Sequence, residues 1–519
     1  MLAKTFSGAV LGIEGYVVRI EVDIAQGLPC FEIVGLPDTV TRESKERVRA
    51  ALKNSGQEFP IKRITVNLAP ATIRKEGTCF DLPIAIGIVA ACGGLPEDAV
   101  SRYLIVGELS LDGELRETTG ILPIAEMARR EGWRGIIVPT GNAREAAVIE
   151  GIEVYPFRRL DEVLRFLAGD LSVPAFPSIP GLIRGSTASN TPDIDSDVDF
   201  SDVKGHQHAK RALEVAVAGG HNVLMIGPPG SGKTMLARRI PTILPPLERD
   251  EAIQVTKIYS IAGLISPDSG LVTARPFRAP HHTASDTGMI GGGKVPRPGE
   301  ISLAHRGVLF LDELPEFRRN VLESLRQPLE DGVITISRAS GSVCYPARFT
   351  LIATSNPCQC GFFGDPSRPC TCSPQSVRRY MSRVSGPLLD RIDMHIEVPR
   401  LTQEELISMG PCEPSASIRE RVMQARSIQA KRFRRSGPGS PVCNAEMGTH
   451  DIKEFCMITR DGELLLENAM TRLRLSGRAY FRILKVARTI ADLAASDVIR
   501  VEHVAEAIQY RALDRKWWD

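Results

Sequence analysis

The sequence has few aromatic residues and no large excess of charge of either sign. Phe, Trp and Tyr make up 5% of the 519 residues, which argues against wide base-stacking platforms. The 64 Lys and Arg residues nearly balance the 62 Asp and Glu residues, which leaves a formal net charge of +2. A nucleic-acid binder held only by a global positive field is therefore excluded, and any contact with DNA or RNA must come from local patches.

The sequence also lacks long apolar runs. The longest candidate, residues 82–92, falls short of the roughly 18 residues that indicate a transmembrane helix, so we expect no membrane partner. The N-terminus has no apolar segment before a small-residue cleavage site, so we expect no signal peptide. Seven of the 11 cysteines are scattered singly, which suits a reduced cytoplasmic compartment better than a disulfide framework.

The chain is long enough for about three domains of ordinary size. Residues 1–168 alternate strand-like and helix-like patterns and predict an α/β or α+β unit. Residues 169–198 are rich in Pro, Ser, Thr and Asp and predict a flexible linker. A second α/β unit is expected over residues 199–400 and a helical region over residues 401–519, with a basic loop between helices at residues 431–444.

The strongest local signal is GPPGSGKT, which matches the phosphate-binding pattern G-x-x-x-x-G-K-[ST]. A strand is predicted before it at residues 223–226 and a helix after it at residues 235–240, as the motif requires. Glycines let backbone N–H groups turn around phosphates, and the helix N-terminus attracts negative charge. We expect Lys233 to reach the β- and γ-phosphates of ATP and Thr234 to hold Mg²⁺. The predicted nucleotide-binding residues are Gly227, Pro228, Pro229, Gly230, Ser231, Gly232, Lys233 and Thr234.

Polar side chains follow two further predicted strands. Residues 308–311 lead into Asp312 and Glu313, and an acidic pair at the end of a buried parallel strand suits Mg²⁺ coordination and water activation. We expect Asp312 to act on the metal and Glu313 to polarise the attacking water. Residues 349–353 lead to Asn356, which we expect to orient that water. The alternative at each position is an ordinary polar residue in a turn.

Arg391 precedes another predicted strand, at residues 394–398, and is a candidate arginine finger. An arginine finger stabilises charge on the transferring phosphoryl group and raises the rate by a factor of about 10³ to 10⁵. The alternative is a surface salt bridge with Asp390 or Asp393, worth no more than about 1 kcal/mol.

In this order the motifs resemble those of AAA+ ATPases, and closely the magnesium-chelatase-related ComM/YifB family of bacteria, over essentially the whole chain. The resemblance implies an ATP hydrolase with a P-loop α/β core, a helix-2 insertion and a helical C-terminal lid. The segment LSGRAYFRILKVARTIADL resembles the lid helix that carries a second sensor arginine, which implies Arg478, with Arg482 as the alternative.

Two segments resemble the protrusions that point into the pore of ring-shaped helicases. The helix-2 insertion is implied by PFRAPHHTAS and GGGKVPRPGE, and a hairpin is predicted around residues 339–341. Their basic side chains are candidates for contacts with the DNA backbone, and the alternative is ordinary solvated loop charge. These candidates are Arg278, His281, His282, Lys294, Arg297, Arg338 and Arg348.

The N-terminal unit resembles the Lon-protease-type α+β domain, on the segment VGELSLDGELRETTGILPIAEMARREGWRGIIVP. The positions of its catalytic serine and lysine correspond to Cys79 and Leu122. A Ser–Lys dyad needs a hydroxyl and an amine, and neither is present. We therefore expect a non-proteolytic module for assembly or partner binding, with Cys79 as a lone nucleophile as the alternative.

Four cysteines cluster just after Asn356 as C-x-C-x₉-C-x-C: Cys358, Cys360, Cys370 and Cys372. Four thiolates can close a tetrahedral structural Zn²⁺ site, and the turn-rich sequence between the pairs suits a loop wrapped on a metal. The spacing departs from the usual C-x₂-C pairs, so four incidental loop thiols are the alternative.

The residues and the resemblance together predict a DNA motor. A neighbour's Arg391 would complete the ATP site, which implies a homo-oligomeric ring, in this family a hexamer. The resemblance implies a helicase that acts on single-stranded or branched DNA, with recombination proteins, to promote branch migration during natural transformation. Two alternatives stay open: a regulatory or chaperone ATPase with protein clients, and a chelatase-like motor subunit, which the absence of a D-x-S-x-S motif disfavours.

Overall fold

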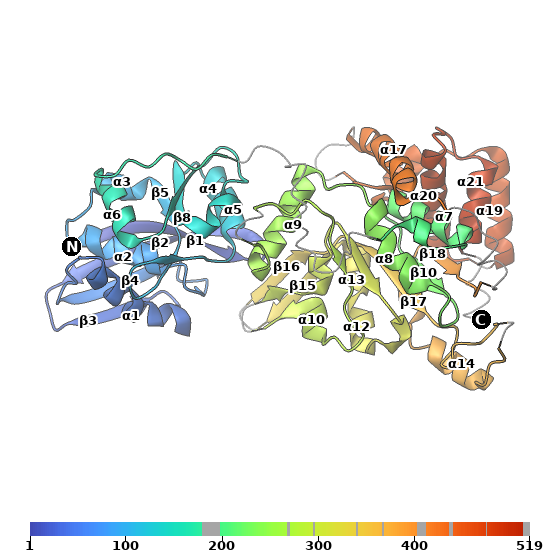
Figure 1. The fold of residues 1–519 in the computed structure, drawn as a ribbon, viewed down its shortest axis with the longest axis horizontal. Helices are drawn as coiled ribbons and strands as arrows, with labels where there is room; N and C mark the ends of the chain where they lie inside the picture. Colours follow the sequence, from blue (N-terminus) through green and yellow to red (C-terminus); the bar gives the residue numbers. More distant parts are fainter. Residues whose placement is uncertain are drawn as a thin grey trace.

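The structure is a computed structural model, and three parts follow one another along its long axis (Figure 1): an N-terminal α/β part, a central part and a group of C-terminal helices. It describes residues 1–178, 198–266, 270–293, 296–338, 341–365, 368–401, 412–434, 440–473 and 475–511. Within these ranges, no helix has the length and apolar character needed to cross a membrane.

The N-terminal part contains two main sheets with helices packed against them. Its strands are β1 (Leu2–Leu11), β2 (Glu14–Ala25), β3 (Cys30–Val34), β4 (Arg63–Ala69), β5 (Tyr103–Ile105), β6 (Glu108–Leu109), β7 (Leu115–Arg116), β8 (Gly135–Pro139) and β9 (Glu153–Phe157). Its helices are α1 (Thr39–Asn54), α2 (Asp81–Ala91), α3 (Glu97–Ser101), α4 (Ile121–Arg130), α5 (Ala143–Ala146) and α6 (Leu160–Ala168). The larger sheet has the order β1-β2-β4-β3 and the second, parallel sheet the order β5-β8-β9.

The longest apolar run of the sequence forms most of α2, which lies in the core of the N-terminal part. Nearly all of its side chains are buried, which explains a run without helical alternation. Gly87 lets α2 approach the sheet closely, because an added Cβ would lie 2.7 Å from Cγ2 of Val22 in β2.

The segment expected to be a flexible linker begins packed on the N-terminal part. The N–H of Phe176 donates to the carbonyl oxygen of Val154 in β9, at 2.7 Å. Leu171 and Val173 pack against the same core. The linker predicted from residue 169 therefore starts later, and residues 179–197 lie outside the described residues.

The central part is built on a five-stranded parallel sheet of order β11-β14-β17-β10-β18. The strands here are β10 (Val223–Ile226), β11 (Phe277–Arg278), β12 (Gly291–Gly292), β13 (Arg297–Pro298), β14 (Val308–Leu311), β15 (Val333–Arg338), β16 (Gly341–Pro346), β17 (Thr350–Ser355) and β18 (Met394–Glu397). The helices are α7 (Gln207–Gly219), α8 (Lys233–Ile243), α9 (Arg249–Ala262), α10 (Asp286–Ile290), α11 (Glu300–Leu303), α12 (Arg319–Ser324), α13 (Arg326–Asp331), α14 (Pro374–Met381) and α15 (Gly386–Leu389). Strands β10 and β14 are buried at every residue, as expected for a parallel sheet covered on both faces.

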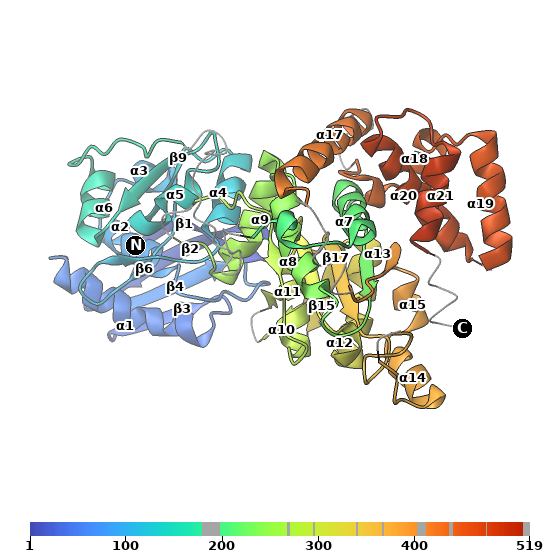
Figure 2. The same cartoon turned by 45° about the vertical axis from the view of Figure 1, so that its right-hand side comes forward.

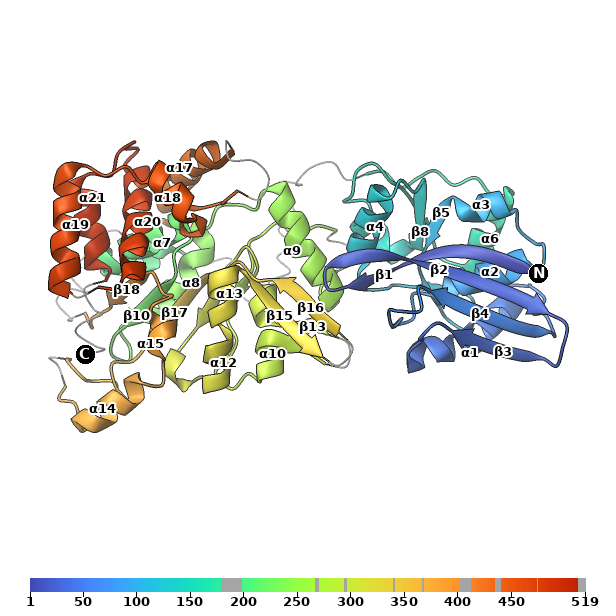
Figure 3. The same cartoon turned by 180° about the vertical axis from the view of Figure 1, so that it is seen from behind.

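The hairpin predicted around residues 339–341 is present as β15 and β16, which pair antiparallel. The turn between β1 and β2 contacts it: a Cβ added to Gly12 would lie 3.1 Å from Cγ1 of Val343. Figure 3 shows the two hairpins from behind, with the end of the β1–β2 pair reaching toward β16. The N-terminal part therefore touches one of the two segments that we expected to project into a pore.

The C-terminal part is helical, as predicted. Its helices are α17 (Ser415–Phe433), α18 (Thr449–Phe455), α19 (Arg460–Leu473), α20 (Gly477–Leu493) and α21 (Val501–Gln509). Figure 2 shows α17 and α20 beside α7, and the three helices share one core with the central sheet. The prediction of a basic loop at residues 431–444 is wrong at its start, because α17 continues through Phe433; residues 435–439 lie outside the described residues.

Candidate functional site

The GPPGSGKT loop connects β10 to α8 at the carboxyl edge of the parallel sheet. Gly230 and Gly232 have φ angles of +76° and +88°, a region that favours glycine. Gly227 is held close to the residue that follows β18, because an added Cβ would lie 2.1 Å from the carbonyl oxygen of Val398. The helix predicted at residues 235–240 is longer and begins at Lys233, so the loop ends at a helix N-terminus.

Lys233 lies under this loop with little exposure. Its Nζ donates to the carbonyl oxygens of Gly227 and Pro228 at 2.7 and 2.9 Å, and to Oδ1 of Asn356 at 3.3 Å. Burial lowers the pKa of Lys233 to about 8, against the opposing charges of Asp312 and Glu313. A bound polyphosphate would supply the nearby negative charge that a buried ammonium group needs.

Asp312 is held by hydroxyl groups from two other elements. Thr234 Oγ1 donates to Oδ2 of Asp312 at 2.9 Å, and Thr354 Oγ1 donates to Oδ1. The N–H of Glu313 donates to Thr354 Oγ1 at 2.9 Å. A carboxylate beside a threonine hydroxyl is a set of hard oxygen donors of the kind Mg²⁺ prefers.

Two features next to Asp312 were not expected from the sequence. We assigned no role to Thr354, although it lies in the polar run after the predicted strand at residues 349–353. Glu313 has a φ of +55°, an uncommon conformation for a residue with a side chain. Such conformations cost about 1–3 kcal/mol and gather at functional sites.

The strand that leads to Asn356 lies between the other two strands of the site. In the sheet, β17 pairs with β14 on one side and with β10 on the other. This order brings the end of β17 between Lys233 and Asp312. The four sequence-predicted residues Lys233, Thr234, Asp312 and Asn356 therefore lie together at one edge of the sheet, joined by hydrogen bonds.

Arg391 and Arg478 lie together but apart from that cluster. Both form ion pairs with Glu330 of α13, and the Arg478 Nη2 to Glu330 Oε1 distance is 3.5 Å. The salt bridge that we considered for Arg391, with Asp390 or Asp393, is not the one that forms.

The alternative second sensor, Arg482, contacts the backbone of Arg391 and the side chain of Asp393. Its Nη1 donates to the carbonyl oxygen of Arg391 at 2.8 Å, and it forms an ion pair with Asp393. Arg482 is thus held by neighbouring groups, whereas Arg478 is largely exposed.

Arg391 lies near the amino edge of the sheet. It stands three residues before Met394, the first residue of β18, and Met394 pairs with Val223, the first residue of β10. The phosphate-binding loop begins after the other end of β10, about 10 Å away along the strand. Arg391 and the phosphate-binding loop of one chain therefore occupy opposite edges of the sheet.

Some of the candidates for DNA contacts form ion pairs within the chain, and others are exposed. Arg278 forms a bidentate pair with Glu300 at 2.6 and 2.7 Å, which weakens its case as a DNA contact. Arg348 pairs with Glu446 at 3.1 Å and is less than half exposed. Arg297 is exposed in β13. His281 is exposed and its neighbour His282 is half-buried, and their ring centroids lie 4.1 Å apart. Lys294 and the side chain of Arg338 lie outside the described part of the chain.

The N-terminal part does not place a nucleophile at the expected position. Burial raises the pKa of the Cys79 thiol to about 12, so it stays protonated at neutral pH. Leu122 is fully buried in α4. The alternative of Cys79 as a lone nucleophile is therefore not supported.

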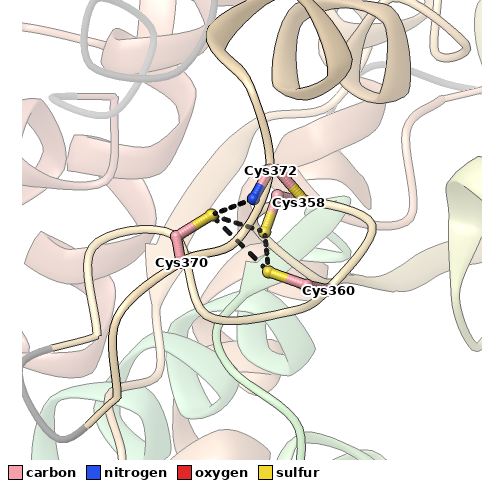
Figure 4. Close-up of side chains that lie close together, drawn as sticks. All are labelled: Cys358, Cys360, Cys370 and Cys372. Carbon is pink, nitrogen blue, oxygen red and sulfur yellow. Dashed lines mark hydrogen bonds between the residues drawn. The ribbon is translucent and has the colours of Figure 1, made fainter.

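The four clustered cysteines lie together beside α14 (Figure 4). Cys358 Sγ lies 3.3 Å from Cys360 Sγ and 3.7 Å from Cys370 Sγ, and Cys360 and Cys370 are 3.5 Å apart. All four sulfur atoms, including that of Cys372, are within 4.8 Å of one another. They form the group of candidate metal ligands found among the described residues.

Three families of magnesium-chelatase subunits match parts of this chain. The family described as magnesium chelatase, subunit ChlI, matches residues 199–406, and the C-terminal family of that subunit matches residues 412–511. A third family, subunit ChlI of Mg-chelatase, matches residues 20–142. The chain is 45% identical over 519 residues to the competence protein ComM of Haemophilus influenzae, over 99% of this chain and 98% of that protein. The chain belongs to the ComM/YifB family, which is related to magnesium chelatase.

Two other relatives differ in how much of this chain they match. YifB of Escherichia coli is 44% identical over 517 residues, which are 99% of this chain and 98% of that protein. The magnesium-chelatase subunit ChlI of Euglena gracilis is 23% identical over 233 residues, which are 40% of this chain and 60% of that subunit. Similarity to ComM and YifB thus runs through the whole chain, whereas similarity to this chelatase subunit covers less than half.

Proposed function

We propose that this ComM/YifB protein is an ATP-driven DNA motor, in which neighbouring protomers of a hexameric ring complete each other's ATP sites. The observation that carries the proposal is the placement of Arg391 and the phosphate-binding loop at opposite edges of the sheet. A protomer cannot easily bring its own Arg391 to its own nucleotide, whereas head-to-tail packing in a ring joins one edge to the other.

Each predicted site residue then has a role in ATP hydrolysis. Lys233 neutralises charge on the β- and γ-phosphates, and Glu313 takes the proton of the attacking water, which Asn356 orients. Mg²⁺, held by Asp312 and Thr234, would neutralise charge on the phosphate oxygens. Arg391 of the neighbouring protomer stabilises the transition state, and Arg478 approaches the same nucleotide, because both arginines share Glu330.

Mixing two inactive variants tests the shared site. Lys233→Ala removes nucleotide binding but keeps Arg391, whereas Arg391→Ala keeps nucleotide binding. In rings assembled from equal amounts of both, about one quarter of the sites combine an intact loop with a neighbour's arginine. ATP hydrolysis should therefore reappear on mixing. If each variant alone is inactive and the mixture stays inactive although mixed rings form, the arginine acts within its own chain and the proposal fails.

The DNA substrate is supported by the family and by exposed basic groups. The relative in Haemophilus influenzae is named a competence protein. We propose that the present chain acts in the same process, promoting branch migration of single-stranded or branched recombination intermediates together with recombination proteins. Exposed Arg297 and the pair His281 and His282 offer local contacts in a chain of small net charge.

The 11 cysteines, each among the described residues, are free thiols, which fits the reducing cytoplasm.

A four-way-junction assay with and without ATP tests this substrate. ATP-dependent branch migration, with hydrolysis stimulated by DNA, is the expected result. A hydrolysis rate that DNA leaves unchanged and a protein client raises would favour a regulatory or chaperone ATPase. The chelatase-like alternative is weaker, because the sequence has no D-x-S-x-S motif and the 45% identity to ComM extends over 99% of this chain.

The N-terminal part is proposed to be a Lon-type module for assembly or partner binding without protease activity. The resemblance assigns the dyad positions to Cys79, whose thiol is protonated, and to Leu122, which is buried and apolar. The N-terminal part docks on α9 of the same chain through ion pairs: Lys257 pairs with Glu126, and Arg249 Nη1 lies 2.7 Å from Oε1 of Glu150.

A further inference from the structure

The thiol groups of Cys358, Cys360, Cys370 and Cys372 come from two short loop segments that precede α14. We propose that these four cysteines bind one structural Zn²⁺ ion, and that this ion holds the loop against the phosphate-binding loop in the position needed for ATP hydrolysis. The metal site depends only on the cysteines, whereas the coupling rests on the proposed ATPase activity.

The sulfur separations fit one metal ion better than disulfides. A disulfide bond joins its sulfur atoms at about 2.05 Å, well below the three Sγ–Sγ distances of 3.3, 3.5 and 3.7 Å. A regular tetrahedron with Zn–S bonds of about 2.3 Å places its sulfur atoms about 3.8 Å apart. The four thiols therefore need only small adjustments to surround one ion.

The surroundings of the thiols also suit a structural site. Cys358 is buried, the other three are partly buried, and the backbone N–H of Cys372 donates to Cys370 Sγ at 3.4 Å. N–H groups that donate to ligand sulfur atoms commonly support metal-bound thiolates. The apolar group beneath the thiols is small: Val377, Tyr380 and Met381 of α14. So small a core stabilises a loop weakly, and a bound metal would supply the missing stability.

The cysteine loop is linked to the nucleotide site at two points. Cys358 follows Asn356, whose side chain contacts Lys233, by two residues. Gly361 directly follows Cys360 and packs on the phosphate-binding loop. A Cβ added to Gly361 would lie 2.5 Å from Cγ and Cδ of Pro229. A metal that fixes Cys358 and Cys360 therefore fixes both Asn356 and the support beneath Pro229.

Elemental analysis of the full chain, purified without chelator, tests the metal site. We expect about one Zn²⁺ per chain in the unaltered protein and in the control Cys30→Ser, which changes an exposed cysteine in β3. We expect almost none in the double variant Cys370→Ser and Cys372→Ser. Absence of zinc from the unaltered protein, or iron in its place, would overturn the metal assignment.

ATP hydrolysis by the same proteins tests the coupling. The zinc-free double variant should hydrolyse ATP at least tenfold more slowly than Cys30→Ser. A second variant, Gly361→Ala, should keep its zinc and still lose hydrolysis, because the new methyl group displaces Pro229 and alanine is strained at the φ of +85° that Gly361 adopts. Retained zinc would show that the cysteine loop still folds. Full hydrolysis by either variant would overturn the coupling. Zinc in an unaltered protein that shows no hydrolysis would instead contradict the proposed function and the coupling, leaving the metal site in place.

Discussion

The hydroxyl group of Thr234 donates to Oδ2 of Asp312 at 2.9 Å, which joins the first turn of α8 to the end of β14. The two residues are far apart in sequence, yet Thr234 lies at the start of a helix and Asp312 follows a strand whose positions the parallel sheet determines. Thr354 holds the other oxygen of the same carboxylate from β17. Hydrogen bonds from α8 and β17 thus orient the carboxylate that follows β14 without a bound metal, and such preorganisation favours a precise metal position.

The role of Thr354 can be tested by Thr354→Val, which keeps the shape and removes the hydroxyl group. Asp312 then loses a donor and the N–H of Glu313 loses its acceptor, so we expect ATP hydrolysis to fall about tenfold with little change in nucleotide affinity. Hydrolysis at several Mg²⁺ concentrations and binding of a fluorescent ATP analogue measure the two effects. The matched control is Thr335→Val at an exposed position of β15, which should match the unaltered protein.

The lowered pKa of Lys233 predicts a pH-dependent affinity for ATP. Below about pH 8 the ammonium group is charged and ready for phosphate, whereas above that pH binding must first take up a proton. The affinity should therefore be constant from pH 6.5 to about 7.5 and fall toward tenfold per pH unit above 8. Calorimetry at pH 8.5 in two buffers of different ionisation enthalpy should detect the proton uptake. Lys233→Arg, which stays charged, should show no uptake; equal uptake in both proteins would assign it to another group.

The local elements of the site could be predicted from the sequence, because each depends on a short pattern. Strands β10 and β14 have the predicted bounds, since an uninterrupted apolar run bounded by polar or glycine residues suits a strand buried on both faces. Composition alone predicts a loop for the basic segment after residue 430. The chain there is still helical, because Phe433 is buried in the core and extends α17 by another turn.

The contacts between distant segments could not be predicted in the same way. Glu330 lies 61 residues before Arg391, and nothing in the local pattern of α13 marks it as the shared partner of two arginines. The packing of Gly361 on Pro229 likewise depends on the order of strands in the sheet. Local periodicity determines elements, whereas tertiary packing selects which polar side chains meet.

The contact between the N-terminal part and α9 predicts a clear difference between two glutamates. Glu145 is buried and accepts from the N–H of Leu122 at 2.9 Å and from the hydroxyl group of Ser260. Glu145→Ala should lower the apparent free energy of unfolding by about 2 kcal/mol or more, because both donors stay buried without an acceptor. Glu150→Ala removes a half-exposed pair with Arg249 and should cost less than about 1 kcal/mol. Thermal melting of both variants measures this, and equal costs would contradict the docking that we describe.

Two arginines, Arg297 of β13 and Arg278 of the edge strand β11, should separate DNA binding from stability. Arg297 is exposed in β13, so Arg297→Ala should weaken DNA binding and reduce the slope of log affinity against log salt by about one, as for a lost phosphate contact. Arg278 is paired with Glu300, so Arg278→Ala should leave that slope unchanged and lower thermal stability, because Glu300 loses its partner. Fluorescence anisotropy with labelled single-stranded DNA at several salt concentrations measures the slopes. If Arg278→Ala reduces the slope and Arg297→Ala leaves it unchanged, the DNA runs along the sheet edge at β11 and not past β13.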